Sequence, residues 1–283
     1  MEQGHRPIMP EEILEYLCAS SPDLIVDGTS GGGGHTAIFS RALPNCRILA
    51  VERDPSAFRV LSEKFAGSNV MVVNSSYSEL PDIFAAEGLP LAGGALFDLG
   101  LSSIQLDTPE RGFSHRTSGP LDMRFDQSRG VPASQLLRIR TEKQIADVIY
   151  RYGEEGRSRS IARAIKQKKT LSTTDDLADA VRSAVRGNPV KPLARVFQAI
   201  RIMVNDELGH LERLLSEMHQ WTQSGCRIAV LTFHSLEDRL IKLHFRDSQY
   251  FRQFDPPWML PASAEKRANS RARSARLRLG VRL

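Results

Sequence analysis

Short apolar runs alternate with helical patterns along the first hundred residues. Four of these runs are bounded by Gly, Asp or Asn: 24-LIV-26, 46-CRILAV-51, 70-VMVV-73 and 95-ALF-97. Between them, apolar residues recur at helical spacing, as in the segment 38–43. Short apolar runs that alternate with amphipathic helices are typical of βαβ units. The pattern therefore predicts a parallel sheet in an α/β domain.

The middle of the chain is predicted to be helical. Helical spacing covers 141–151, 157–168 and 174–186, and each segment opens near Ser, Thr or Gly. A fifth apolar run, 227-RIAVLTF-233, follows these helices and predicts a return to the sheet. We expect the helices to form an insertion within the sheet domain. The expected order is a first part of the sheet domain at 1–105, a helical insertion at 106–194 and a second part at 195–283.

Two further patterns lie in the second half of the chain. Pro192 is expected to open one long helix, whose apolar residues from Phe197 to Met218 form a single stripe. In 275-ARLRLGVRL-283, apolar residues alternate with arginines. This alternation predicts a half-buried terminal strand, whose arginines would discourage pairing at an exposed sheet edge.

Composition places the chain among soluble globular proteins. Of its 283 residues, 41% are hydrophobic and 25% are charged, and no apolar run approaches the roughly 18 residues that span a membrane. The N-terminus lacks the basic and then apolar stretch of a signal peptide. The chain has three cysteines, Cys18, Cys46 and Cys226, which are far apart and odd in number. This fits thiols in a reducing compartment. We expect a cytoplasmic protein with no membrane partner and no metal site.

The net charge of +5 is unevenly distributed. Seven Lys or Arg and two acids lie in 151–169, and seven Lys or Arg and one acid lie in 265–283. Local basic patches of this kind favour a polyanion partner such as nucleic acid. The alternative is that both clusters are solvated faces.

The strongest chemical feature is 24-LIVDGTSGGGGHTAIF-39, in which a strand breaks into glycines before a helix begins at His35 or Thr36. Glycines let backbone amides approach a ligand, and a helix N-terminus offers unpaired N–H groups. The segment predicts a nucleotide-type cofactor loop, with a flexible turn as the alternative. Glu52 ends the second strand, where a carboxylate can accept hydrogen bonds from both ribose hydroxyls of an adenosine cofactor. Its alternative is an exposed acid at a strand end.

Other candidates lie where later strands end. Asp98 ends the fourth strand and is expected to face the active cleft, although it could instead cap a loop. His234 follows the fifth strand at the same edge, where a histidine can be structural or catalytic. The segment 109-PERGFSHRTSGPLDMRFD-126 has little helical periodicity, and a long loop in a compact domain is usually functional.

These residues converge on a family. The chain closely resembles the MraW/RsmH family, S-adenosylmethionine-dependent methyltransferases that modify the exocyclic N4 of a decoding-centre cytosine in bacterial 16S ribosomal RNA. The match runs from His5 to the C-terminus. The resemblance is carried by six segments: 27-DGTSGGGGHT-36, 98-DLGLSSIQLDTPERGFSHRTSGPLDMRFD-126, 152-YGEE-155, 195-RVFQAIRIMVNDEL-208, 231-LTFHSLEDRLIK-242 and 271-RARSARLR-278.

The resemblance implies a Rossmann-like methyltransferase sheet with an inserted helical domain that helps to hold RNA. It implies cofactor contacts from seven residues: Gly33, Gly34, His35, Glu52, Tyr77, Asp98 and Gln105. The sequence departs from the family at four places: Glu52 replaces the usual Asp, Tyr77 replaces Phe, Leu193 replaces Thr, and 254–265 is short. The partner implied is 16S ribosomal RNA or the small ribosomal subunit, and a homodimer is left open.

Catalysis and RNA binding are assigned to the remaining candidates. Asp98, Ser102 and His234 are the expected catalytic residues, because each follows a strand whose carboxyl end faces the ligand. The expected RNA contacts are Arg111 and Arg124 in the central loop and Arg271 and Arg273 in the basic tail. Two alternatives use the same residues differently, namely an NAD-dependent oxidoreductase and a non-catalytic RNA-binding protein of ribosome assembly.

Overall fold

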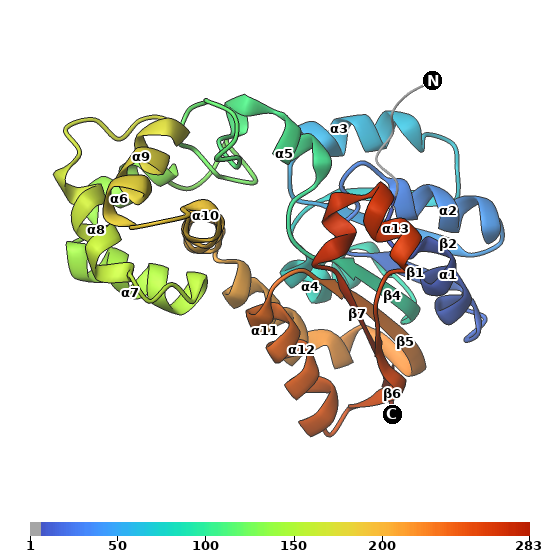
Figure 1. The fold of residues 1–283 in the computed structure, drawn as a ribbon. Helices are drawn as coiled ribbons and strands as arrows, with labels where there is room; N and C mark the ends of the chain where they lie inside the picture. The colour runs from blue at the N-terminus through green and yellow to red at the C-terminus, as the bar shows by residue number, and fades with distance from the viewer. Residues whose placement is uncertain (1–6) are drawn as a thin grey trace. The chain divides into compact units, whose positions relative to one another are not determined.

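The computed structural model describes residues 7–283 and divides into two compact units (Figure 1). Unit 1 contains the chain up to Gly100 and then Gly209–Leu283, whereas unit 2 is the continuous segment Leu101–Leu208. His5, where the family resemblance begins, lies outside the described residues. No helix within 7–283 has the length and apolar character needed to cross a lipid bilayer.

Unit 1 is built on a seven-stranded sheet with the strand order β3-β2-β1-β4-β5-β7-β6. Neighbours from β3 to β5 are parallel, and β7 runs antiparallel to both β5 and β6. The strands are β1 (Leu24–Asp27), β2 (Arg47–Glu52), β3 (Val70–Asn74), β4 (Ala92–Asp98), β5 (Thr222–Thr232), β6 (Phe251–Met259) and β7 (Arg276–Arg282). This confirms the predicted parallel α/β sheet and each of its five predicted strands.

Helices cover both faces of this sheet. Because side chains alternate along a strand, Ile25 packs with α1 and α2 on one face while Val26 packs with α4, α11 and α12 on the other. The helices of unit 1 are α1 (Pro10–Cys18), α2 (Gly34–Ala42), α3 (Pro55–Lys64), α4 (Leu80–Glu87), α11 (Glu207–Glu217, entering from unit 2), α12 (Ser235–Asp247) and α13 (Ser263–Ala268). The result is a doubly wound sheet whose order reverses between β1 and β4, the place where such sheets bind ligands.

Unit 2 is helical and has its own core. Its helices are α5 (Ser103–Asp107), α6 (Ala133–Ile139), α7 (Glu142–Gly153), α8 (Ser158–Gln167), α9 (Thr174–Ala184) and α10 (Val190–Asn205). Helix α10 contributes Val196, Phe197 and Ile200 to this core. The expected boundary at 194/195 is therefore wrong, because it would cut through α10 and divide a single hydrophobic core.

The long helix expected from Pro192 to Met218 is also interrupted. Asp206 has φ 49°, a left-handed conformation that ends α10, and α11 begins at Glu207. The apolar stripe continued through this break, because α10 and α11 each need a buried face in their own unit. The periodicity therefore predicted burial correctly and helix continuity wrongly.

The terminal strand is an inner strand rather than an edge. β7 lies between β5 and β6, and β6 was not predicted because 251-FRQFDPPWM-259 contains two prolines, which edge strands tolerate. The arginine side of β7 therefore has a different role from the one expected. Arg278 is only 4% exposed, and its guanidinium binds the Asp238 carboxylate through two hydrogen bonds of 2.8 and 3.0 Å. Arg276 donates to the same carboxylate at 2.7 Å.

Candidate active site

The glycine loop after β1 is fixed in place by α3. Gly33 has φ 71°, and a Cβ at this position would lie 2.6 Å from Leu61 Cδ2 and 2.9 Å from Phe65 Cε2. From the same helix, Lys64 Nζ donates to the carbonyl oxygens of Gly32 at 3.0 Å and Gly33 at 3.3 Å. The loop is therefore anchored, which argues against a merely flexible turn, and its positive φ and close contacts strongly favour glycine at position 33.

Glu52 closes the same loop from the end of β2. Its Oε2 accepts the Gly31 N–H and its Oε1 accepts the Asp54 N–H, both at 2.7 Å. Because the side chain is buried, the alternative of an exposed strand-end acid is wrong. Burial raises the pKa of Glu52 to about 7, and the nearby Asp54 and Asp27 carboxylates add to the rise. The two backbone N–H groups stabilise the ionised form but do not outweigh burial.

A second buried carboxylate, Asp27, joins the end of β1 to α2. Its Oδ2 accepts the Thr36 hydroxyl at 2.6 Å, which fixes the first turn of α2 against the strand. Burial raises the pKa of Asp27, although the Thr36 hydrogen bond opposes the shift. The ends of β1 and β2 thus place two carboxyl groups around one glycine loop.

Asp98 ends β4 and has the most unusual environment of the predicted residues. Its backbone N–H donates to Thr29 Oγ1 at 2.6 Å, and its Oδ2 lies 3.9 Å from His35 Nδ1. His35 Nε2 lies 3.0 Å from the Ile8 carbonyl oxygen, so this ring is fixed in turn. Within residues 7–283, Asp98 Oδ1 is buried and has no hydrogen-bond partner. A buried acceptor of this kind requires an explanation, and a ligand donor or cation supplies one.

Tyr77 packs edge-on against the aromatic residues beside this edge of the sheet. Its ring centroid lies 6.0 Å from that of Phe97 and 6.5 Å from that of His210, both in T-shaped geometry. His210 is itself fixed, because its Nδ1 lies 2.6 Å from Ser78 Oγ. Tyr77 is partly buried, so a ring face for adenine is compatible with its position in unit 1.

Ser102 and Gln105 belong to unit 2 and form a reciprocal cap at the start of α5. Ser102 Oγ accepts the Gln105 N–H, and Gln105 Oε1 accepts the Ser102 N–H, both at 3.2 Å. A capping box of this type stabilises the helix start. The predicted roles of Ser102 in catalysis and Gln105 in cofactor binding stay predictions.

His234 is a helix cap, so the structural interpretation is the one that the contacts favour. Its Nδ1 accepts the Glu237 N–H at 3.4 Å at the start of α12, and its Nε2 lies 3.0 Å from Glu237 Oε1. Although Nε2 lies at ion-pair distance from this glutamate, it is buried and makes no hydrogen bond within residues 7–283. The expected catalytic role of His234 therefore stays a prediction.

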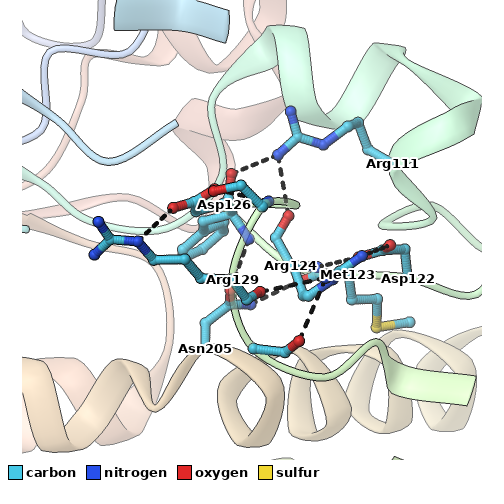
Figure 2. Close-up of polar contacts among 10 residues, drawn as sticks. Arg111, Asp122, Met123, Arg124, Asp126, Arg129 and Asn205 are labelled. Carbon is cyan, nitrogen blue, oxygen red and sulfur yellow. Dashed lines mark hydrogen bonds and ion pairs between the residues drawn. The ribbon is translucent and has the colours of Figure 1, made fainter. Parts of the chain in front are cut away.

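Two of the four arginines expected to bind RNA are used inside unit 2. Figure 2 shows that Arg111 Nη2 donates to the carbonyl oxygens of Arg124 at 3.0 Å and Phe125 at 2.7 Å. Arg124 forms a bidentate pair with Asp122, with Nε and Nη2 at 2.8 and 2.7 Å from its two oxygens. The prediction of phosphate contacts is wrong for Arg111, which is buried, and is not favoured for Arg124, whose charge is neutralised.

The two tail arginines are more accessible. Arg273 is exposed, and its Nε donates to the Lys266 carbonyl oxygen at 3.2 Å. The Arg271 guanidinium lies 5.5 Å from the centre of the Phe233 ring, an arrangement that favours a cation–π contact. Their RNA contacts stay predictions.

Sequence reasoning missed Lys64 and Asn205. Lys64 falls on an exposed helix face, where a lysine carries no pattern that distinguishes a loop anchor from a solvated charge. Asn205 Nδ2 donates to the Met123 carbonyl oxygen at 2.7 Å, and its Oδ1 accepts the Phe125 N–H at 2.8 Å (Figure 2). Asn205 is buried, and a buried amide is normally hydrogen-bonded, but this burial is visible only in the structure.

The sheet order, the anchored glycine loop and the carboxylates that end β1, β2 and β4 define a Rossmann-like cofactor-binding enzyme. The model of the MraW methylase family matches residues 2–282, so the chain belongs to that family.

Curated relatives agree over nearly the whole chain. Proteins named ribosomal RNA small subunit methyltransferase H are 42% identical in Sorangium cellulosum, over 99% of this chain and 91% of theirs, and 40% identical in Coprothermobacter proteolyticus, over 97% and 95%. The relative of the same name from Trichormus variabilis is 41% identical over 98% of this chain and 91% of its own.

Proposed function

We propose that this methyltransferase transfers a methyl group from S-adenosylmethionine to the exocyclic N4 of a decoding-centre cytosine in 16S ribosomal RNA, and that it acts in the cytoplasm. The observation that carries the proposal is Asp98, whose buried Oδ1 has no hydrogen-bond partner among residues 7–283 and which lies beside an anchored glycine loop. Membership of a methylase family supports the reaction class, and the names of the curated relatives support the substrate.

The charges at the strand ends fit this cofactor better than a dinucleotide. Asp98 lies beside the glycine loop, where a carboxylate can pair with the sulfonium or the ammonium of S-adenosylmethionine. Glu52 does not discriminate between the two cofactors, because an acid at the end of the second strand suits the ribose of either. The residues that would hold the cofactor are Gly33, Gly34, His35, Glu52, Tyr77, Asp98 and Gln105.

Bound S-adenosylmethionine supplies an electrophilic methyl group, because its sulfonium leaves as a neutral thioether. Cytosine N4 is a weak nucleophile, since its lone pair is delocalised into the ring. In the proposal, Asp98 accepts a hydrogen bond from this amino group and so favours its pyramidal, nucleophilic form. N4 would provide the electron pair for the new C–N bond, and the proton that it loses would pass to the Asp98 carboxylate, which we assign as its acceptor. Ser102 is the alternative acceptor for the amino group.

RNA is expected to bind both units through exposed basic residues. In unit 2, the proposed contacts are Arg151, Arg157 and Arg159, which are exposed around the turn that joins α7 to α8. In unit 1, the proposed contacts are Arg271 and Arg273. Each phosphate contact adds to the salt dependence of binding, so removing one should lower the slope of log affinity against log salt.

The test combines cofactor titration with methyl transfer. Calorimetry with S-adenosylmethionine and with NAD, followed by transfer of labelled methyl to small-subunit RNA, separates the three functions considered. We expect binding of S-adenosylmethionine alone and labelling of one cytosine. Binding of NAD would indicate an oxidoreductase, and RNA binding without transfer would indicate an assembly factor. Either result would overturn the proposal.

We also propose that the chain can pair with a second copy to form a homodimer. Light scattering tests this directly, because the monomer has a mass of 31.5 kDa. A measured mass of 31.5 kDa at all concentrations would exclude the dimer, whereas twice that mass would support it.

A further inference from the structure

The backbone of residues 123–125 in unit 2 has every polar group hydrogen-bonded by dedicated partners (Figure 2). Arg111 supplies three of the six bonds: its carbonyl accepts the Met123 N–H at 3.0 Å, and its Nη2 donates to the Arg124 and Phe125 carbonyls. Asn205 supplies two, to the Met123 carbonyl and from the Phe125 N–H. The sixth runs from the Arg124 N–H to Asp122 Oδ1 at 3.0 Å.

These bonds hold a strained conformation. Met123 has φ 63°, which is unfavourable for a residue with a long side chain, and its side chain is fully buried. Backbone strain of this kind persists only where surrounding contacts determine it completely, and it gathers at active sites and ligand clamps. The strain therefore points to a segment selected for its position.

The partners of this segment are themselves fixed. Asn205 Nδ2 also donates to the Arg201 carbonyl oxygen at 3.0 Å, which ties the amide to the end of α10. Arg201 in turn binds both Glu207 oxygens at 2.8 and 2.9 Å. Because α10 packs in the core of unit 2, the segment is bound to a rigid element.

The tip that follows this segment presents one charged side chain outward. Asp126 Oδ1 accepts the N–H and the hydroxyl of Ser128 at 2.9 and 2.6 Å, and Arg124 Nη1 donates to the carbonyls of Arg129 and Gly130. The Arg129 side chain is 85% exposed and lies 3.7 Å from Asp126 Oδ2 (Figure 2). Its backbone is thus held while its guanidinium is accessible, which suits a phosphate contact.

We propose that residues 122–130 form a preorganised RNA-binding loop, in which Arg111 and Asn205 are positioning residues and Arg129 is the phosphate ligand. The inference rests on the proposed function, because it takes RNA as the substrate. It assigns binding to an arginine that the sequence patterns did not single out, and it gives Arg111 an internal role. Preorganisation matters because a loop that is already ordered loses less entropy when it binds.

The first test measures the salt dependence of binding to small-subunit RNA. Arg129→Ala should lower the slope of log affinity against log salt by about 0.7 to 0.9, the amount expected for one lost phosphate contact. The matched control is Arg182→Ala, because Arg182 is also exposed in unit 2 and pairs with Asp179 at the same i,i+3 spacing. The control should keep the wild-type slope. If Arg129→Ala keeps it too, the assignment of Arg129 is refuted.

The second test separates positioning from stability. Asn205→Ala and Arg111→Lys should expose the bond after Arg124 to trypsin, lower kcat/KM for RNA at least tenfold and leave the Kd of S-adenosylmethionine within twofold. Cleavage without any change in kcat/KM would overturn the positioning role. If Asn205→Ala does not fold, the exposed Arg129→Ala variant still decides the proposal. A wild-type protein that binds cofactor but never labels RNA would instead refute the proposed function.

Discussion

Glu52 should make cofactor binding depend on pH near neutrality. In the free protein its carboxyl group is buried and has a pKa of about 7, so roughly half of the molecules carry a neutral Glu52 at that pH. Ribose hydroxyls donate hydrogen bonds to the ionised form, so bound cofactor should lower this pKa. Binding must then release a proton below pH 7. The apparent affinity should rise with pH up to about 7 and be flat above it.

The size of the effect follows from the pKa. At pH 6, one unit below the pKa, about one molecule in eleven has an ionised Glu52, so affinity should be about tenfold weaker than on the plateau. This corresponds to about 1.4 kcal/mol. Glu52→Gln cannot ionise and should remove the slope. It should also cost about 1 to 3 kcal/mol of binding or stability, because its amide nitrogen would face a backbone N–H.

Calorimetry between pH 5.5 and 8, in buffers of different ionisation enthalpy, measures both the affinity and the protons released. Asp27 also has a raised pKa, so the difference between wild type and Glu52→Gln isolates Glu52. A wild-type affinity that does not change with pH would refute the reasoning. So would an equal slope in the Gln variant. Stability of the cofactor-free protein gives an independent check. Because the pKa of Glu52 is higher in the folded than in the unfolded protein, this group stabilises the folded state below about pH 4.5. The contribution is lost as the pH rises through 7.

The other predictions concern chemistry, the loop and the sheet. Asp98→Asn should slow methyl transfer by about 10²-fold or more in single turnovers at saturating labelled cofactor, and a wild-type rate would leave Asp98 without a catalytic role. Gly33→Val should lower the thermal midpoint and abolish cofactor binding, because the new side chain meets α3 at a positive φ; an unchanged melt would contradict this. Asp238→Ala should cost about 3 to 5 kcal/mol in urea unfolding by leaving Arg278 buried and unpaired, whereas exposed Asp247→Ala should cost little.

The sequence predicted the fold where one physical signal dominated. Buried parallel strands such as 46-CRILAV-51 form apolar runs whatever surrounds them, and five strands were found in this way. β6 was missed because an edge strand with two prolines has neither the composition nor the alternation of a buried one. The break at Asp206 was missed because a stripe of apolar residues indicates which side of a helix is buried, not whether the helix is interrupted.

The site was predictable at the strand ends and less so elsewhere. Glu52 and Asp98 follow buried strands, and the topology of a parallel sheet brings such ends together. His234 and Arg111 could not be assigned, because a ring or a guanidinium that completes a local hydrogen-bond network looks the same in sequence as one that faces a ligand. The contacts of each side chain decide between these roles. The contact of His234 with Glu237 and that of Arg111 with the Phe125 carbonyl oxygen are visible only in the structure.

Unit 2 interrupts unit 1 between β4 and β5, and this has a consequence for the order of folding. β5 can pair with β4 only after the whole of Leu101–Leu208 has been accommodated as a loop. The entropy lost on closing a loop grows with its flexible length, so an unfolded unit 2 makes this pairing harder. Unit 2 is continuous and has its own core, so it can collapse first and shorten the loop. A mutation in a helix of unit 2, at a residue that contacts neither cofactor nor RNA, would then slow the assembly of the sheet in unit 1.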